Sequence, residues 1–265
     1  GDMTTKQRDT LLASMTDQVA ELVLKNNYEQ NHAIGMIANE AVSVWQNLKN
    51  LISTLETTAH LDRALERLPN DKVMQERKVS GKGLARPEIS VLLAYTKQLL
   101  KTELLTQAEN INPALYQLSL VDYFPIQLQT AYPEEVQQHR LGKEIVANQL
   151  INQLVNRLGI VFPHRFIQEL NCSVADLVNT YYLVCRVFEI DSLWKMQSDL
   201  DGVVSESVLD GIKLNTRKWI ERAMYWFVRN EPNLSSAEHY IQAISELSAD
   251  LSQLVTEKEQ QQIDS

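Results

Sequence analysis

Residues 4–24, TTKQRDTLLASMTDQVAELVL, show most directly how this chain folds. Large apolar side chains recur there three and four residues apart, at Leu11, Leu12, Met15, Val19, Leu22 and Val23. An α-helix turns once in about 3.6 residues, so this spacing places them along one helical face. Thr4 and Gln7 have the three-residue spacing of a capping box, which predicts that the helix begins there.

The same periodicity continues through the rest of the chain. A second long helix is predicted over residues 34–55, and we expect it to pair with the first as an antiparallel hairpin around Asn26–Asn31. Further helices are predicted over residues 134–158, closed by Gly159, over 173–188, and over about 204–229. The last begins near Ser235, where Tyr240, Ile244, Leu247, Leu251 and Leu254 follow at coiled-coil spacing.

No segment between turns alternates β-branched and polar residues over the length of a strand. Without strands there is no βαβ unit, and therefore no sheet on which a dinucleotide could bind. The sequence predicts an all-α fold, an array or bundle of roughly ten helices with no β-sheet. Gly81-Lys82-Gly83 is the clearest loop, which divides the chain into 1–80, a helical core over 81–232, and a C-terminal amphipathic helix with a frayed tail over 233–265.

Composition and charge limit the cellular compartments and the kinds of partner that we expect. The net charge of −9 repels phosphate, so no nucleic-acid partner is expected. No apolar stretch approaches the roughly 20 residues of a membrane span, and nothing at the start resembles a signal peptide, so we expect no membrane partner and a cytoplasmic location. Cys172 and Cys185 match no zinc motif, and Cys185 falls on an apolar stripe, where we expect it to be buried. The first methionine is Met3, which suggests a piece of a longer protein.

No motif predicts a catalytic, cofactor-binding or metal-binding residue. Gly81-Lys82-Gly83 lacks the preceding strand and the further glycine of a phosphate-binding loop. Glu29 and His32 have the spacing of a di-iron motif, but they fall in the expected hairpin turn and have no second copy.

One polar pattern stands out on the predicted helix 134–158. Polar residues recur there every four positions, with one more arginine beside them: Arg140, Glu144, Asn148, Asn152, Asn156 and Arg157. On the pattern alone a solvated helix face is the better interpretation. The alternative is a buried polar network, whose hydrogen bonds would fix how the helix packs.

At this point a family resemblance becomes visible. Residues 83–97, GLARPEISVLLAYTK, closely resemble the GLxRPExxVLLAYxK signature of the large bacterial NAD-specific glutamate dehydrogenases. Residues 139–160 resemble the next characteristic block of that family, apart from Gly142, where a charged residue is expected. Residues 8–28 are similar to the stretch that follows the family's catalytic domain.

The resemblance implies an enzyme that oxidises L-glutamate with NAD and water to 2-oxoglutarate, ammonium and NADH. Its substrate lysines and its NAD site are expected upstream, so this segment would hold no cofactor and would be inactive alone. Residues 1–80 would lead from the catalytic domain, and the segment would brace that domain and contribute to a homo-oligomer. Because Asn152, Asn156 and Arg157 match family positions, the resemblance favours the structural network. The alternative function is a free-standing helical scaffold that binds a protein partner.

Overall fold

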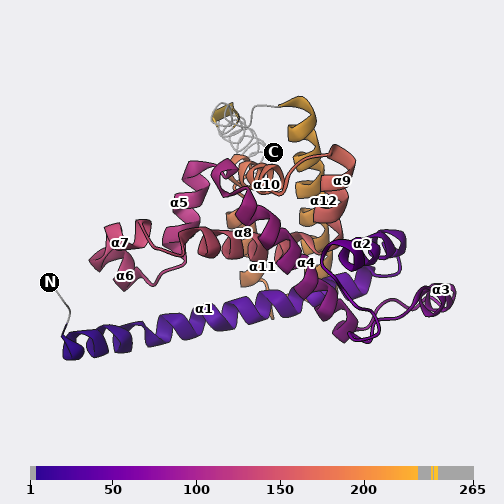
Figure 1. The fold of residues 1–265 in the computed structure, drawn as a ribbon, viewed down its shortest axis with the longest axis horizontal. Coiled ribbons are helices and arrows are strands. Elements are labelled where there is room, and N and C mark those ends of the chain that lie inside the picture. Colours follow the sequence, from indigo (N-terminus) through magenta and orange to yellow (C-terminus); the bar gives the residue numbers. More distant parts are fainter. Residues whose placement is uncertain (1–3, 232–239, 241, 244–265) are drawn as a thin grey trace, which may run out of the picture. The chain divides into compact units, whose positions relative to one another are not determined.

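The computed structural model describes residues 4–231, 240, 242 and 243, and in that part of the chain it contains twelve α-helices and no strand (Figure 1). The predicted all-α class is therefore confirmed. The chain divides into two compact units, residues 1–178 and 179–265. The predicted boundary at Gly81 falls inside the first unit, in the turn before a helix.

The first unit holds helices α1 to α9 and a short 3₁₀ helix, and α10 crosses into the second. In chain order these are α1 Thr5–Glu40, α2 Trp45–Thr58, α3 Asp71–Val79, α4 Arg86–Thr106, the 3₁₀ helix Ala108–Asn110, α5 Pro113–Asp122, α6 Ile126–Ala131, α7 Pro133–Gln137, α8 Gly142–Leu158, α9 Val161–Leu170 and α10 Val174–Val187. The second unit continues with α11 Ile190–Asp199 and α12 Glu206–Asn230.

Helix α1 is a single helix of 36 residues, so the predicted hairpin around Asn26–Asn31 is wrong. The capping box at its start is confirmed, with Thr4 and Gln7 bonded to each other. Asparagine lowers helix propensity only slightly and did not break the helix. The Asn31 amide donates to the Asn27 carbonyl one turn earlier, at 3.1 Å. The helix ends instead at Glu40, whose carbonyl accepts from the hydroxyl of Ser43 at 2.8 Å.

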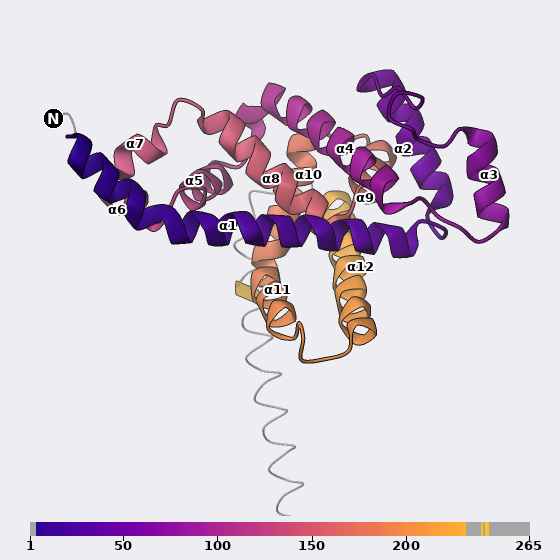
Figure 2. The same cartoon turned by 90° about the horizontal axis from the view of Figure 1, so that it is seen from below.

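The core of the first unit lies where α1, α4 and α8 pack together (Figure 2). Each contributes buried apolar side chains: Ala33, Ile34 and Ile37 from α1, Ile89, Leu92, Leu93 and Leu100 from α4, and Val146, Ile151, Leu154 and Val155 from α8. The C-terminal half of α1 alone takes part in this core, whereas its N-terminal half lies beside α6.

The predicted helix 134–158 is interrupted, because residues 138–141 separate α7 from α8. At the break the ring nitrogen Nδ1 of His139 accepts from the Leu141 N–H, and the His139 carbonyl accepts from the Gly142 N–H at 2.8 Å. Gly142 is therefore the first residue of α8 and not a mid-helix glycine. A Cβ there would lie 2.8 Å from the hydroxyl of Tyr116. Gly159 caps the other end, at φ +78°, as predicted.

In the second unit α11 and α12 pack together, and the Gln197 amide of α11 donates to the hydroxyl of Thr216 of α12 at 2.8 Å. Phe188, in the turn between α10 and α11, lies with its ring 4.6 Å from that of Trp219 of α12. Helices α10 and α12 confirm two predicted helices, and Cys185 is buried as expected. The predicted helix that begins near Ser235 lies outside the described residues.

Candidate functional site

The signature segment 83–97 forms the start of α4 and ties it to two neighbouring elements. Glu88 accepts the Ala85 backbone N–H at 2.7 Å, so it satisfies a free donor at the helix start. The same carboxylate pairs with Arg77 of α3 at 2.7 Å, and this hydrogen bond raises the pKa of Arg77. On the other side, a Cβ at Gly83 would lie 2.7 Å from the Cβ of Ala41, at the end of α1. The segment thus fixes where α4 begins relative to α1 and α3.

Lys97, the last residue of the signature, connects α4 to α8. Its ammonium donates to the Asn156 side-chain oxygen at 2.8 Å. Burial lowers the pKa of Lys97 from its ordinary 10.5 to about 8, although the Glu29 carboxylate on α1 raises it. Asn156 is 5% exposed, and its amide nitrogen has no hydrogen-bond partner among the described residues. Each of the three core helices therefore contributes one polar group to this junction.

The structure places the predicted polar residues in different environments. Arg140 is exposed and precedes α8, Glu144 and Asn148 are exposed, Asn152 and Arg157 are partly buried, and Asn156 is buried. Four residues advance the helix by about 400°, so a four-residue repeat winds around the axis by about 40° at each step. The pattern therefore begins in solvent and ends in the core. A network through all six residues stays a prediction. Of these residues, Asn156 makes a hydrogen bond to Lys97 on a neighbouring helix.

Sequence reasoning missed Lys97, although a signal was present. Lys97 follows Leu93 by four residues and precedes Leu100 by three, so it occupies a position on the apolar face of α4. Thr96 beside it is buried as well. A lysine on an apolar helical stripe indicates a polar partner across the interface, because a buried ammonium needs an acceptor.

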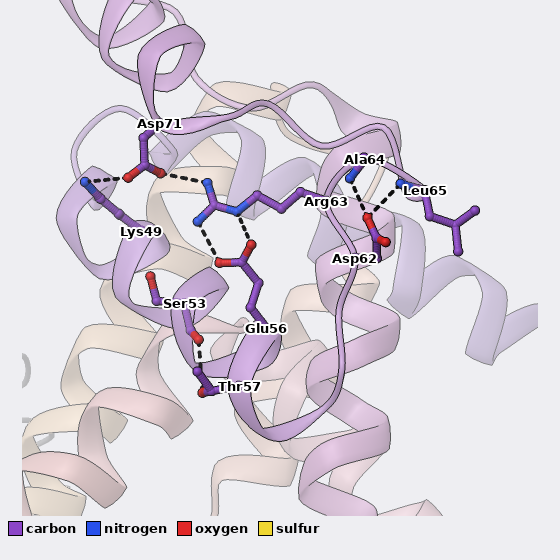
Figure 3. A network of polar contacts seen from close by, with 9 residues as sticks. All are labelled: Lys49, Ser53, Glu56, Thr57, Asp62, Arg63, Ala64, Leu65 and Asp71. Carbon is purple, nitrogen blue, oxygen red and sulfur yellow. Dashed lines mark hydrogen bonds and ion pairs between the residues drawn. The ribbon is translucent and has the colours of Figure 1, made fainter.

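A second polar cluster joins α2 to α3 through the loop between them (Figure 3). The Arg63 guanidinium makes two contacts with Glu56, at 2.7 and 2.9 Å, and one with Asp71, at 2.7 Å. Lys49 contacts the other oxygen of Asp71 at 3.0 Å. Hydrogen bonds from Arg63 and Lys49 lower the pKa of Asp71. This cluster holds α3 onto α2, and no motif in the sequence pointed to it.

At these junctions the polar side chains hold helices to one another. In residues 4–231, together with 240, 242 and 243, no three His, Cys, Asp or Glu side chains gather as metal ligands would. Over the same residues, no helix combines the length and the hydropathy needed to cross a membrane. Of the histidines, His164 bonds the Thr54 hydroxyl at 2.8 Å and thereby connects α9 to α2.

Comparison with known proteins shows which family these elements match. Residues 81–265 match the model described as "Glutamate dehydrogenase, C-terminal", and residues 1–37 match "Bacterial NAD-glutamate dehydrogenase, catalytic domain". The second match overlaps the segment 8–28, which the resemblance had placed after the catalytic domain, so that placement is corrected. Residues 38–80, which include α2, α3 and the Arg63 cluster, lie outside both matches.

Curated relatives named NAD-specific glutamate dehydrogenase agree with these matches. The protein from Halomonas elongata is 32% identical over 99% of this chain, and that from Pseudomonas aeruginosa is 36% identical over 88%. The protein from Mycobacterium tuberculosis is 33% identical over 88%. This chain spans 14 to 16% of the length of these relatives. Since the C-terminal family model covers more than half of the chain, the chain belongs to the glutamate dehydrogenase C-terminal family.

Proposed function

We propose that this chain is the non-catalytic helical C-terminal region of an NAD-dependent glutamate dehydrogenase. The longer polypeptide would convert L-glutamate, NAD and water to 2-oxoglutarate, ammonium and NADH. The helical region would brace the catalytic domain and contribute to contacts between copies of the enzyme.

The observation that carries this proposal is the family match over residues 81–265, in the same order as in much longer relatives. The fold supports it. Dinucleotide sites of the doubly wound kind lie at the edge of a parallel sheet, and the described residues form helices without a strand. The polar groups of the core, such as Lys97 and Asn156, are engaged between helices.

The test is a truncation of the full-length polypeptide after residue 80. We expect the truncated protein to lose solubility or its assembled mass, measured by size exclusion with light scattering. Any soluble remainder should keep its KM for glutamate and NAD, because the residues that bind them precede the deletion. A truncated protein that stays soluble, fully assembled and fully active would contradict the bracing role.

A second arm tests the absence of catalysis in this segment. The 265-residue chain, incubated with glutamate and NAD, should form no NADH. Formation of NADH by the purified chain would place reacting groups within it and overturn the proposal.

A further inference from the structure

The N-terminal half of α1 exposes a row of large apolar side chains. Leu12 is 54% exposed, Val19 45% and Val23 55%. At about 100° per residue these three lie within about 40° of one another around the helix axis, so they form one stripe. Monomeric surfaces seldom leave such an apolar stripe in water unless something binds it.

Farther along the same helix, buried apolar side chains lie on the same side as this stripe. Ile34 and Ile37 lie on the same side of α1 within about 60° of Val19, and both are buried, in the half of the helix that packs with α4 and α8. Two apolar segments, separated by the polar residues Asn26 and Gln30, therefore share one side of α1, and α4 and α8 reach only the C-terminal one (Figure 2).

Helix α6 covers a neighbouring side of the exposed half and leaves the stripe free. The Gln127 amide donates to the Ser14 carbonyl at 3.1 Å, and the Ile126 N–H donates to the Gln18 side chain at 3.2 Å. Met15, next to these contacts, is buried. Ser14 and Gln18 lie about 100° or more around the axis from Val19. The α6 contacts thus fix the orientation of α1 with the stripe pointing away from α6.

The family matches suggest an occupant for the stripe. Residues 1–37 match a catalytic-domain model, and from Thr5 they form part of one helix. A catalytic domain that binds NAD on a doubly wound fold needs a parallel sheet, so the rest of that domain is polypeptide outside these residues. A helix that belongs to a domain buries its apolar face on the remainder of that domain.

We propose that Leu12, Val19 and Val23 form the docking surface through which α1 packs on an apolar surface of the remainder of the catalytic domain, upstream in the same polypeptide. This inference rests on the proposed function. Because α1 is unbroken from Thr5 to Glu40, the same rigid helix is docked at one end to the catalytic domain and packed at the other with α4 and α8.

The test uses single cysteines in the full-length protein. Val19→Cys probes the stripe, and Val79→Cys on α3, where the valine is 81% exposed, is the matched control. Reaction with a maleimide is followed by peptide mass spectrometry, so that each thiol is measured separately. We expect Val19→Cys to react about tenfold or more slowly than the control in the native protein, because the covered site must open first, and at the same rate in denaturant. Equal rates in the native protein would overturn the docking surface.

A crosslinker attached at Val19→Cys identifies the occupant. A link within one polypeptide to a residue that precedes position 1 supports the proposal. A link to any residue of 1–265, or a band of doubled mass on a denaturing gel, overturns it. The labelling does not depend on turnover, so an enzyme that fails to oxidise glutamate refutes the proposed function while the surface is still judged by its own result.

Discussion

The close approach between Gly83 and Ala41 gives the sharpest test of how the signature segment works. A Cβ on Gly83 would lie 2.7 Å from the Cβ of Ala41, whereas apolar carbons in contact lie about 3.5–4.0 Å apart. Ala41 is fully buried, and neither methyl group has a rotamer that could move it aside. Gly83→Ala must therefore shift backbone by nearly an ångström, and overpacking of this kind costs about 1–3 kcal/mol.

A double-mutant cycle separates this clash from other effects. Ala41→Gly alone should cost about 1–2 kcal/mol, through a lost buried methyl group and greater freedom of the unfolded chain. When both changes are combined, the clash disappears, so the double variant should be about as stable as Ala41→Gly alone. Urea denaturation followed by circular dichroism measures each variant. Losses that add within about 0.5 kcal/mol would refute the reasoning, because they would show that the two positions do not touch.

Three further predictions concern other parts of the chain. Gly211→Ala should stabilise the chain by about 0.5–1 kcal/mol in thermal unfolding, since Gly211 lies within α12 and a Cβ there meets no atom within 4 Å. Burial lowers the pKa of Lys97 to about 8, so between about pH 7 and 9 the folded chain loses a proton that the unfolded chain keeps. Stability should therefore rise over that interval, by about 0.5–1 kcal/mol after allowance for solvent screening, and Lys97→Met should lack the rise in pH-dependent denaturation. Arg63→Lys should cost about 1 kcal/mol in urea, because a lysine cannot reproduce the forked contacts, while Lys49→Met at the surface should change stability by less than about 0.5 kcal/mol.

The helices were predictable because apolar spacing is a local property of the sequence. Thr4 with Gln7 and Gly159 marked helix ends correctly, since capping depends on residues within one turn. The prediction of a hairpin around Asn26–Asn31 was wrong because asparagine lowers helix propensity only slightly. Tertiary contacts along α1 override so small an effect. The break before Gly142 was missed because apolar periodicity reports neither the hydrogen bond to the His139 ring nor the close approach of Tyr116 to Gly142.

The polar junctions were harder to predict than the helices. The four-residue spacing of the asparagines was visible, but how deep each one lies depends on how α1 and α4 cover α8. The partner of Asn156 lies 59 residues earlier in the chain, and the Arg63 cluster brings together three segments through a loop. Such contacts follow from how the helices pack, so the sequence indicated them only through Lys97, a charged residue on the apolar face of α4. In the same way, the apolar stripe of α1 was predicted from the sequence, whereas its exposure to solvent in the N-terminal half of the helix was not.

We propose that helices α4 to α12 support an active site without forming it. A structure of the full-length enzyme with NAD and glutamate bound tests this directly. We expect both ligands to contact residues that precede position 81, and no side chain of residues 81–231 to lie within hydrogen-bond distance of either. Density for NAD or glutamate against any of α4 to α12 would contradict the account.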